Sequence, residues 1–454
     1  MTKRCLLSAS GCVCVAVVLA CGAAATAPPT ISDAKDKQIV AKFAAHAARV
    51  PQRLSAAYCR KLAADQAEGY CWLVMPQFEM TLTAYQLTGD ERHVEAFVRV
   101  FANMRGALTK GPDGYLGWYG KALSLFRDPK DPGRKVDVII SSFRAVDVLS
   151  RFLEAVAGDE KLAQKYAGRR AEYLDLMENH FVKKWLARGR FVDLGGKGAI
   201  VRTHAGLRDV KGNLTQPHNK HSIIARALLA LYRVTGKDPY MKMAVQLGTR
   251  FKHCLTLRDG HYEWNYWDPA GAWDTHPADA KRWKHWIGPE HRSGYYSTSL
   301  TQAVALYHHG VVFDRTDVDR FVKTQMEMCW NADPASPKWY RVDRSRGKQS
   351  GAYICPALAP FHEKIHAFCY TGARQDERIA RADHSWQGGP VANGYLRGKY
   401  LDGPAAKGGR QVHAEHGRRF RQKPANRQFL ESLAFAVKGS GYRAPGSPTG
   451  LGRD

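Results

Sequence analysis

Apolar residues recur at helical spacing in five separate stretches of the chain. Between positions 219 and 255, for example, Ile223, Ala227 and Leu231 repeat every four residues. Such spacing places the apolar side chains on one face of a helix. The pattern predicts five helical pairs and one extra helix ahead of them. The pairs span about 69–108, 136–185, 219–255, 294–330 and 351–382, and the extra helix spans about 33–64.

A short phrase that ends in glycine separates the two helices of each pair. Positions 85–90 read YQLTGD and positions 232–237 read YRVTGK, and looser copies end at Gly158, Gly310 and Gly372. Glycine adopts the left-handed conformation at low cost, so each of these glycines is predicted to end a helix. Strand patterns are few, at about 190–192 and 199–203.

The turns within pairs are short, whereas the connections between pairs are long. These connections cover about 109–135, 187–218, 258–293 and 331–350, and loops of that length are usually functional. The pattern predicts an all-α fold, an (α/α)n toroid or incomplete barrel of helical hairpins with long loops on one face. A curved, open solenoid is the structural alternative.

The first 27 residues are typical of a secretory signal peptide. Lys3 and Arg4 precede an apolar run from 5 to 20, which is too short and wrongly flanked for a membrane anchor. Cleavage after Ala27 and cleavage before a lipidated Cys21 are both compatible with the sequence. The expected domains are therefore a signal peptide (1–27), a toroid catalytic domain (28–400) and a basic, partly disordered tail (401–454). The expected location is periplasmic, secreted or anchored to the outer membrane through Cys21.

The charge balance indicates an anionic partner. The chain of 454 residues has 68 Lys and Arg against 42 Asp and Glu, a formal charge of +26. Such a field attracts polyanions, and export makes nucleic acid the weakest candidate among them. An acidic polysaccharide is therefore the expected partner, with no nucleic acid. Six cysteines follow Ala27, and they are either buried thiols or members of one or two disulfides.

Chemically active side chains cluster just before and at the start of the first helix of several pairs. Asn219 and His221 open the third pair, and Arg292 precedes Tyr295 and Tyr296 in the fourth. Amide, imidazole and guanidinium groups can neutralise the carboxylate of a uronic acid, and a tyrosine can then remove the adjacent proton. This set suits cleavage by β-elimination.

The same residues resemble the catalytic arrangement of the α/α-toroid polysaccharide lyases, the alginate and glucuronan lyase group within the six-hairpin-type carbohydrate-active superfamily. The resemblance covers about 69–386 and rests on few residues. It implies that Asn219, His221 and Arg292 neutralise the carboxylate and that Tyr296 is the base and acid, with Tyr295 as second choice. In that group the Asn and His are often adjacent, whereas here Lys220 separates them. The implied function is an exported lyase for a polysaccharide that contains uronic acid.

Aromatic residues in the long loops are the expected substrate-binding groups. The residues predicted to bind sugar are Trp264, Trp267, Tyr262, Trp118, His291 and Lys220. For each residue a plain structural role is the competing interpretation, such as a helix cap for His221 or core packing for the tyrosines.

Two further functions stay open. A glycoside hydrolase would use paired carboxylates, with candidates Asp137, Glu263, Asp268, Asp274 and Glu290, of which Glu263 and Asp268 lie among loop aromatics. A non-catalytic, carbohydrate-binding envelope protein is the third interpretation. No cofactor is expected, and no metal, because the available histidines (His204, His218, His221 and His276) show no ligand spacing that favours one.

Overall fold

The computed structural model describes residues 27–204, 206–208, 211–290, 293–346, 351–382, 387–403, 410–435 and 437. The predicted signal peptide up to residue 26, with Cys21, lies outside these residues, as do His291 and Arg292. Within the described part of the chain, no helix is both long and apolar enough to cross a bilayer.

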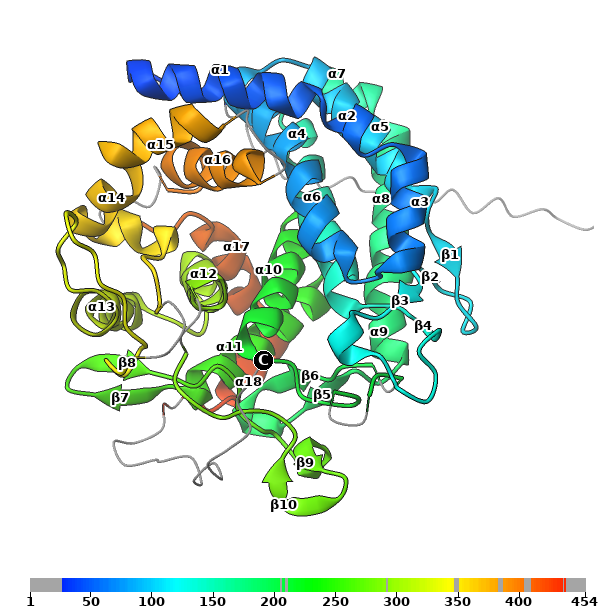
Figure 1. The fold of residues 1–454 in the computed structure, drawn as a ribbon, viewed down its shortest axis with the longest axis vertical. Coiled ribbons are helices and arrows are strands. Elements are labelled where there is room, and N and C mark those ends of the chain that lie inside the picture. Colours follow the sequence, from blue (N-terminus) through cyan, green and yellow to red (C-terminus); the bar gives the residue numbers. More distant parts are fainter. Residues whose placement is uncertain are drawn as a thin grey trace, which may run out of the picture.

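An inner set of long helices forms the frame of the molecule. Helix α10 lies against α6 on one side and α12 on the other, and α6 also contacts α4. Figure 1 shows these helices running around the middle of the molecule with other helices outside them. The inner helices are α4 (Met75–Thr88), α6 (Ile139–Ala157), α10 (His218–Thr235) and α12 (Ser293–His308).

Outer helices pair with the inner ones along the chain. Helix α5 packs on α4, α11 packs on α10 and α12, and α13 packs on α12. These pairs are the predicted hairpins. The outer elements are α5 (Arg92–Arg105), α7 (Glu160–Lys165), α8 (Ala167–Asp175), η3 (Leu176–Val182), α9 (Lys183–Ala187), α11 (Asp238–Cys254), α13 (Arg315–Lys323) and η6 (Thr324–Cys329).

The two ends of the described chain close the ring. Helix α1 (Ala34–Ala48) packs against α4, α15 (Ala373–Arg381) and α16 (Gly388–Leu396), and α16 also contacts α4. In Figure 1 the blue N-terminal helix lies beside the orange α15 and α16. The all-α toroid is thereby confirmed. The remaining N-terminal elements are α2 (Val50–Arg53), α3 (Ala56–Asp65) and the π-helical turn η1 (Tyr70–Val74).

Four of the five predicted turn glycines have the left-handed backbone. Gly89, Gly236, Gly310 and Gly372 have φ of 71°, 68°, 63° and 56°. Gly158 has φ −78° and ends α6 in a right-handed conformation. At Gly236 the amide bonds to the carbonyl of Tyr232, which closes the last turn of α10.

The fifth pair departs from the predicted pattern. Its first helix is a short 3-10 segment, η7 (Pro356–Phe361), followed by α14 (Glu363–Tyr370). Pro360 lies inside η7 and has no amide hydrogen to donate to an α-helical ladder. Proline content therefore explains why this inner position is not a long helix.

Five two-stranded antiparallel hairpins decorate the long connections. The predicted strands at 190–192 and 199–203 correspond to β5 (Phe191–Asp193) and β6 (Ala199–Val201), which pair with each other. The other strands of the described residues were not predicted. They are β1 (Thr109–Lys110), β2 (Leu116–Gly117), β3 (Gly120–Lys121), β4 (Lys135–Val136), β7 (Thr256–Arg258), β8 (His261–Glu263), β9 (Thr275–His276) and β10 (Asp279–Trp283); short 3-10 turns lie at η2 (Ser124–Phe126), η4 (Gly195–Lys197) and η5 (Ala272–Asp274).

The apolar core lies between the inner and outer helices. Phe97 of α5 stacks on Phe78 of α4 and on Phe152 of α6, with ring centroids 4.2 Å apart in each case. The six cysteines of the described residues are free thiols, and all but Cys369 are fully buried. Cys59, Cys71, Cys329 and Cys355 therefore act as small core side chains.

The segment after residue 401, expected to be a basic and partly disordered tail, is helical over two stretches. Segment η8 (Arg397–Leu401) continues α16, and the tail beyond it forms α17 (Ala414–Gln422) and α18 (Pro424–Glu431). Phe420 packs edge-on against Tyr232 of α10 at 6.1 Å, and Lys423 pairs with Asp238 of α11 at 2.8 Å. The tail as far as α18 is thus part of the toroid, and positions 438–454 lie outside the described residues.

Candidate functional site

The starts of the inner helices lie together at one end of the ring. Lys220, in the first turn of α10, reaches Glu68, which precedes α4, with Nζ to Oε1 at 3.3 Å. Ser141, in the first turn of α6, donates to the carbonyl of Ala67 at 3.1 Å. The long connections also end here, just ahead of α6, α10 and α12 (Figure 1). We call this end the rim.

The prediction that Tyr296 is the base of a β-elimination is wrong. Its side chain is 0 % exposed and its ring stacks on Trp264 at 5.6 Å. Burial raises the pKa of the phenol well above its usual value, and the neighbouring Cys329, Cys355 and Glu290 raise it further. A phenol that no substrate reaches and that resists ionisation cannot remove a proton at neutral pH.

His221 is also placed for structure rather than for catalysis. The backbone amide of Val201 donates to its Nε2 at 2.9 Å, which ties β6 to the start of α10. Burial, together with the neighbouring His218, lowers the pKa of the imidazole to about 3. His221 is therefore a neutral, buried acceptor, which corrects the predicted role in carboxylate neutralisation.

Asn219 and Tyr295 keep positions near the rim. Asn219 is buried in the first turn of α10, and its amide oxygen has no hydrogen-bond partner among the described residues. Tyr295 is half-buried and stacks on Tyr266 at 5.3 Å. The predicted Arg292 and His291 lie outside the described residues.

The four aromatic rings predicted to stack on sugar belong to the core. Trp118 and Trp267 donate their indole N–H groups to the carbonyls of Met104 and Thr215, and the Tyr262 hydroxyl donates to Asp317. Trp264 packs between Tyr296 and core phenylalanines. Each ring is at most 3 % exposed, so none presents a face to a ligand, and these predictions are wrong.

A different set of side chains lines the rim. Trp72, 43 % exposed, donates its indole N–H to Oε1 of Glu68 at 3.0 Å, beside Lys220. The ammonium of Lys220 lies 5.8 Å from the centre of the Phe126 ring. Burial raises the pKa of the nearby Cys71 thiol to about 12, and the charge of Glu68 acts in the same direction while those of Arg144 and Lys220 oppose it.

The set continues along the rim toward α12. Lys211 lies 5.7 Å from the centre of the Phe126 ring, on which Lys220 also acts. His285 packs edge-on against Tyr266 at 5.6 Å, and Tyr266 stacks on Tyr295. Burial, together with the charges of Lys211 and Lys220, lowers the pKa of His285 to about 3. The rim cluster is hereafter Glu68, Trp72, Phe126, Lys211, Lys220, Tyr266, His285 and Tyr295.

A charged network that the sequence did not reveal lies behind the rim cluster. Glu79 of α4 pairs with Arg151 of α6 at 2.6 Å, and it lies 3.7 Å from Arg144 and 3.6 Å from Arg397. Asp147 pairs with Arg151 at 3.1 Å. Burial alone would raise the pKa of the Glu79 carboxyl, but the surrounding arginines hold it at about 2. The sequence signal was the Arg144, Asp147 and Arg151 spacing on the otherwise apolar helix α6.

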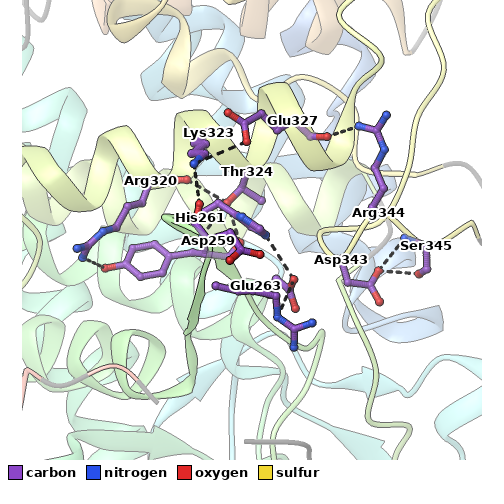
Figure 2. Close-up of polar contacts among 12 residues, drawn as sticks. Asp259, His261, Glu263, Arg320, Lys323, Thr324, Glu327, Asp343, Arg344 and Ser345 are labelled. Atoms are coloured by element: carbon purple, nitrogen blue, oxygen red, sulfur yellow. Dashed lines mark hydrogen bonds and ion pairs between the residues drawn. The ribbon is translucent and has the colours of Figure 1, made fainter. Parts of the chain in front are cut away.

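The carboxylates proposed for hydrolysis are held apart by separate partners. Figure 2 shows Glu263 on the β7–β8 hairpin beneath η6, where it meets His261 at 3.3 Å. Arg258 lies 3.5 Å from the same oxygen of Glu263. Asp268 instead lies 3.0 Å from Nε2 of His218. Each of these two carboxylates thus has a histidine partner of its own.

The other proposed carboxylates are structural. Asp137 is 1 % exposed, and Lys184 and Arg188 bind it at 2.5 and 3.0 Å. Asp274 accepts from the amide and hydroxyl of Thr215 at 2.8 and 2.7 Å. Glu290 is completely buried. Glu68 is the carboxylate that borders exposed aromatic surface at the rim.

A hollow of about 570 Å³ lies elsewhere, between α1 and α5. Its lining includes Ala44, Ala48, Thr88, Asp90 and Arg99. Thr88 and Asp90 flank the turn after α4, so this hollow is at the short-turn end, away from the rim. Its lining has no tryptophan or tyrosine, and it is not the candidate site.

One group of side chains has the composition of a metal site. Donor atoms of His218, Cys254 and Asp268 lie within 4.8 Å of one another, and all three residues are buried. Of the other histidines considered for a metal, His204 and His276 accept hydrogen bonds from nearby backbone amides.

Comparison with known proteins gives a limited result. No family model matches the chain, and no curated protein matches it. One similar solved structure is an inactive variant of an α-1,6-mannanase, GH76A of Salegentibacter sp. HEL1_6, in complex with α-1,6-mannotriose. The identity is 10%, the match covers 83% of this chain and 99% of that chain, and the TM-score is 0.40.

The interpretation as a polysaccharide lyase is therefore corrected. The proposed base Tyr296 is inaccessible and the proposed neutralising residue His221 is engaged in the fold.

Proposed function

We propose that this chain is a glycoside hydrolase whose active site is the rim cluster. The observation that carries the proposal is the position of Glu68. Its carboxylate is held by the indole of Trp72 and the ammonium of Lys220, directly beside an exposed aromatic face. A carboxylate next to an aromatic platform is the combination that glycosidases use to hold a sugar ring and act on its anomeric carbon.

Glu68 would act as the nucleophile or as the base that activates water. Both roles need a carboxylate oxygen that faces the sugar while the rest of the group is fixed. The indole of Trp72 and the ammonium of Lys220 both donate to the same oxygen of Glu68, Oε1, which leaves Oε2 on the other side of the carboxylate. Trp72, 43 % exposed, would stack on the sugar next to the bond that breaks.

The proposed substrate is an anionic glycan. Lys211 and Lys220 lie 5.7 and 5.8 Å from the centre of the Phe126 ring at the rim. Rim loops carry further cations stacked on aromatic rings, such as Arg341 over Trp286 at 5.8 Å. A formal charge of +26 adds a long-range field that draws in a polyanion.

The place of action would be outside the cytoplasm. The support is the signal-like segment of residues 1–27 with its basic start and apolar run. Fractionation of cells that express the full chain, with mass measurement of the mature protein, tests export and distinguishes cleavage after Ala27 from lipidation of Cys21.

The test is a hydrolysis panel with matched carboxylate variants. Alginate, glucuronan, glycosaminoglycans and a neutral mannan are incubated with the chain, and new reducing ends are measured. We expect reducing ends from at least one anionic glycan without the ultraviolet absorbance of an unsaturated uronate. Glu68→Gln should lower the rate at least a hundredfold, because an amide is neither nucleophile nor base. Glu263→Gln, a carboxylate on the β7–β8 hairpin, should leave the rate within twofold.

Two outcomes would reject the proposal. Full activity of Glu68→Gln would remove this carboxylate from the chemistry. Glycan binding without new reducing ends on any substrate would instead favour the non-catalytic, carbohydrate-binding interpretation.

A further inference from the structure

Three buried side chains from distant parts of the sequence converge beneath the rim. His218 is the first residue of α10, Cys254 is the last residue of α11, and Asp268 lies in the connection after β8. Their donor atoms (an imidazole nitrogen, a thiol sulfur and a carboxylate oxygen) lie within 4.8 Å of one another. His218 and Cys254 are each 2 % exposed and Asp268 is 5 % exposed. Buried ionisable groups need a compensating partner, either each other or a metal ion.

We infer that His218, Cys254 and Asp268 form a zinc site that fixes the rim connection to helices α10 and α11. Zinc is bound in proteins by one-atom donors of these three kinds, at about 2.0–2.3 Å. Donors on such a tetrahedron are about 3.3–3.7 Å apart, by the same bond lengths. The observed separation of 3.0 Å between Nε2 of His218 and Oδ2 of Asp268 is close to that range, so small side-chain rotations suffice.

The charges of the group match a divalent cation. Binding would displace the thiol proton of Cys254 to solvent, so that a thiolate and a carboxylate face the ion while His218 binds as neutral imidazole. Two negative ligands cancel the double positive charge, and a neutral assembly is the kind that can be buried at low cost. Sulfur and nitrogen donors favour zinc over magnesium or calcium.

Neighbouring groups orient the proposed ligands. The side-chain amide of Asn265 donates to Oδ1 of Asp268 at 3.0 Å, which leaves Oδ2 directed at His218. Arg250 donates to the carbonyl of Pro269 at 2.9 Å and fixes the backbone next to Asp268. The ring of Phe251 packs on His218 at 5.2 Å. Such supporting contacts are typical of metal ligands, and three protein ligands leave one tetrahedral position for water.

No local motif predicts this site, because its ligands are 36 and 14 residues apart along the chain. Zinc motifs that are recognisable in sequence keep ligands within a few residues of each other. Here the fold brings the ligands together, since α11 runs back along α10 and ends next to the start of α10.

Metal analysis of the untagged full chain tests the inference. The protein is purified without chelator, and zinc is measured by mass spectrometry; we expect one zinc per chain. After exchange, cobalt should give a near-ultraviolet thiolate-to-cobalt absorption band. Cys254→Ser should abolish the band and lower zinc content at least tenfold. The matched control Cys71→Ser, also a buried free thiol, should keep both.

Two results would overturn the site. The first is a folded wild-type chain that holds no zinc and gives no cobalt band after unfolding and refolding with either ion; this result does not depend on whether any variant folds. The second is zinc retained at one per chain in both Cys254→Ser and Asp268→Asn. Neither readout requires glycan hydrolysis, so the result is independent of the proposed function.

Discussion

Tyr296 shows how residue type alone can mislead at a helix start. The side chain is in the first turn of α12 next to the rim, yet it turns inward and stacks on Trp264. Tyr295, its neighbour, points to the rim cluster instead. Consecutive residues of a helix point about 100° apart, so a Tyr-Tyr pair always divides between faces. The sequence located the pair, but packing decided which tyrosine is accessible.

A conservative variant tests this assignment. Tyr296→Phe removes a fully buried hydroxyl whose polar neighbour is the thiol of Cys329. Deleting such a group should change the free energy of unfolding by less than about 1 kcal/mol. We expect glycan hydrolysis to stay within twofold of wild type, measured on the substrate found in the panel. Loss of hydrolysis with intact folding would return Tyr296 to the mechanism.

Because some buried histidines are neutral in the folded protein, we expect the free energy of unfolding to fall as the pH is lowered. Burial lowers the pKa of His221 to about 3 and that of His413 to about 2, against about 6.5 in an unfolded chain. The unfolded state therefore binds protons first as pH falls. This contribution to stability is complete above about pH 6.5 and is lost progressively toward about pH 3.

The size of the effect can be isolated at His221. Each such group contributes a slope of up to about 1.4 kcal/mol per pH unit below about pH 6.5. His221→Gln can still accept from the Val201 amide but has no proton to bind. We expect denaturant unfolding between about pH 5 and about pH 6.5 to show a slope smaller by about 1 kcal/mol per pH unit in the variant. An unchanged slope would contradict the buried neutral state.

At the scale of elements, periodicity predicted the long helices well and the decorated connections poorly. Helices α10 and α11 span 218–235 and 238–254, against a prediction of about 219–255. An amphipathic helix repeats its signal over several turns. Strand pairs of two or three residues, such as β1 with β2, have no room for a repeat. Helices α16 to α18 were missed because glycine and charge weaken their apolar pattern.

The lack of a repeating sequence signal in the long loops also explains why some residues of the rim cluster were not predicted. The rim was located from the loop lengths, and Lys220 and Tyr295 belong to it. The exposure of Trp72 and the burial of Trp264 and Trp267 depend on how the loops fold over the core. Side-chain accessibility in a long loop has no local sequence signature, so the sugar-stacking residues were misassigned.

The glycines between paired helices allow a prediction about the stability of these turns. Gly236 has φ 68° and open space around its Cα, so an added Cβ meets no neighbour and only the backbone conformation is penalised. Gly236→Ala should lower the free energy of unfolding by about 1 kcal/mol. Gly168, inside α8, also has open space but an ordinary helical φ. Gly168→Ala should be neutral or stabilising by up to about 1 kcal/mol.

Thermal and denaturant unfolding of the two variants measure the difference. Equal destabilisation by both would show that the left-handed turn is not the cause. Because Gly89 repeats the conformation of Gly236 with φ 71°, the result would apply to the repeated phrase and not to one turn.

For the whole molecule, the decisive feature is how the two ends of the chain close the ring. Asp36 of α1 is 0 % exposed and accepts hydrogen bonds from Tyr395 at 2.7 Å and from Gln375 at 3.3 Å. Lys399 and the hydroxyl of Tyr400 bind its other oxygen. One carboxylate thus joins the first helix to α15, α16 and η8, across more than 330 residues of sequence.

A second pair offers a matched control for this closure. Lys35 and Asp376 also join α1 to α15, at 2.6 Å, but their side chains are 47% and 60% exposed. Exposed pairs contribute at most about 1 kcal/mol, whereas loss of one partner from a buried network costs about 3–5 kcal/mol. Asp36→Asn keeps the size of the side chain but removes the charge opposite Lys399. It should lower the free energy of unfolding by about 3 kcal/mol, while Asp376→Asn should cost less than about 1 kcal/mol.

Closure also predicts where the weakened molecule opens. If the Asp36 contacts hold α1 against α16 and η8, their loss should free the two ends of the ring before the inner helices α6 and α10 unfold. Limited proteolysis of Asp36→Asn should therefore release N-terminal or C-terminal fragments first, and hydrogen exchange should rise in α1, α16 and η8 but not in α10. Uniform exchange throughout the variant would mean that the toroid unfolds as one unit and that closure at Asp36 has no separate role. Opening confined to the ends would show that the apolar core alone does not keep this all-α ring closed. The polar contacts of Asp36, between segments far apart in sequence, would then be needed as well.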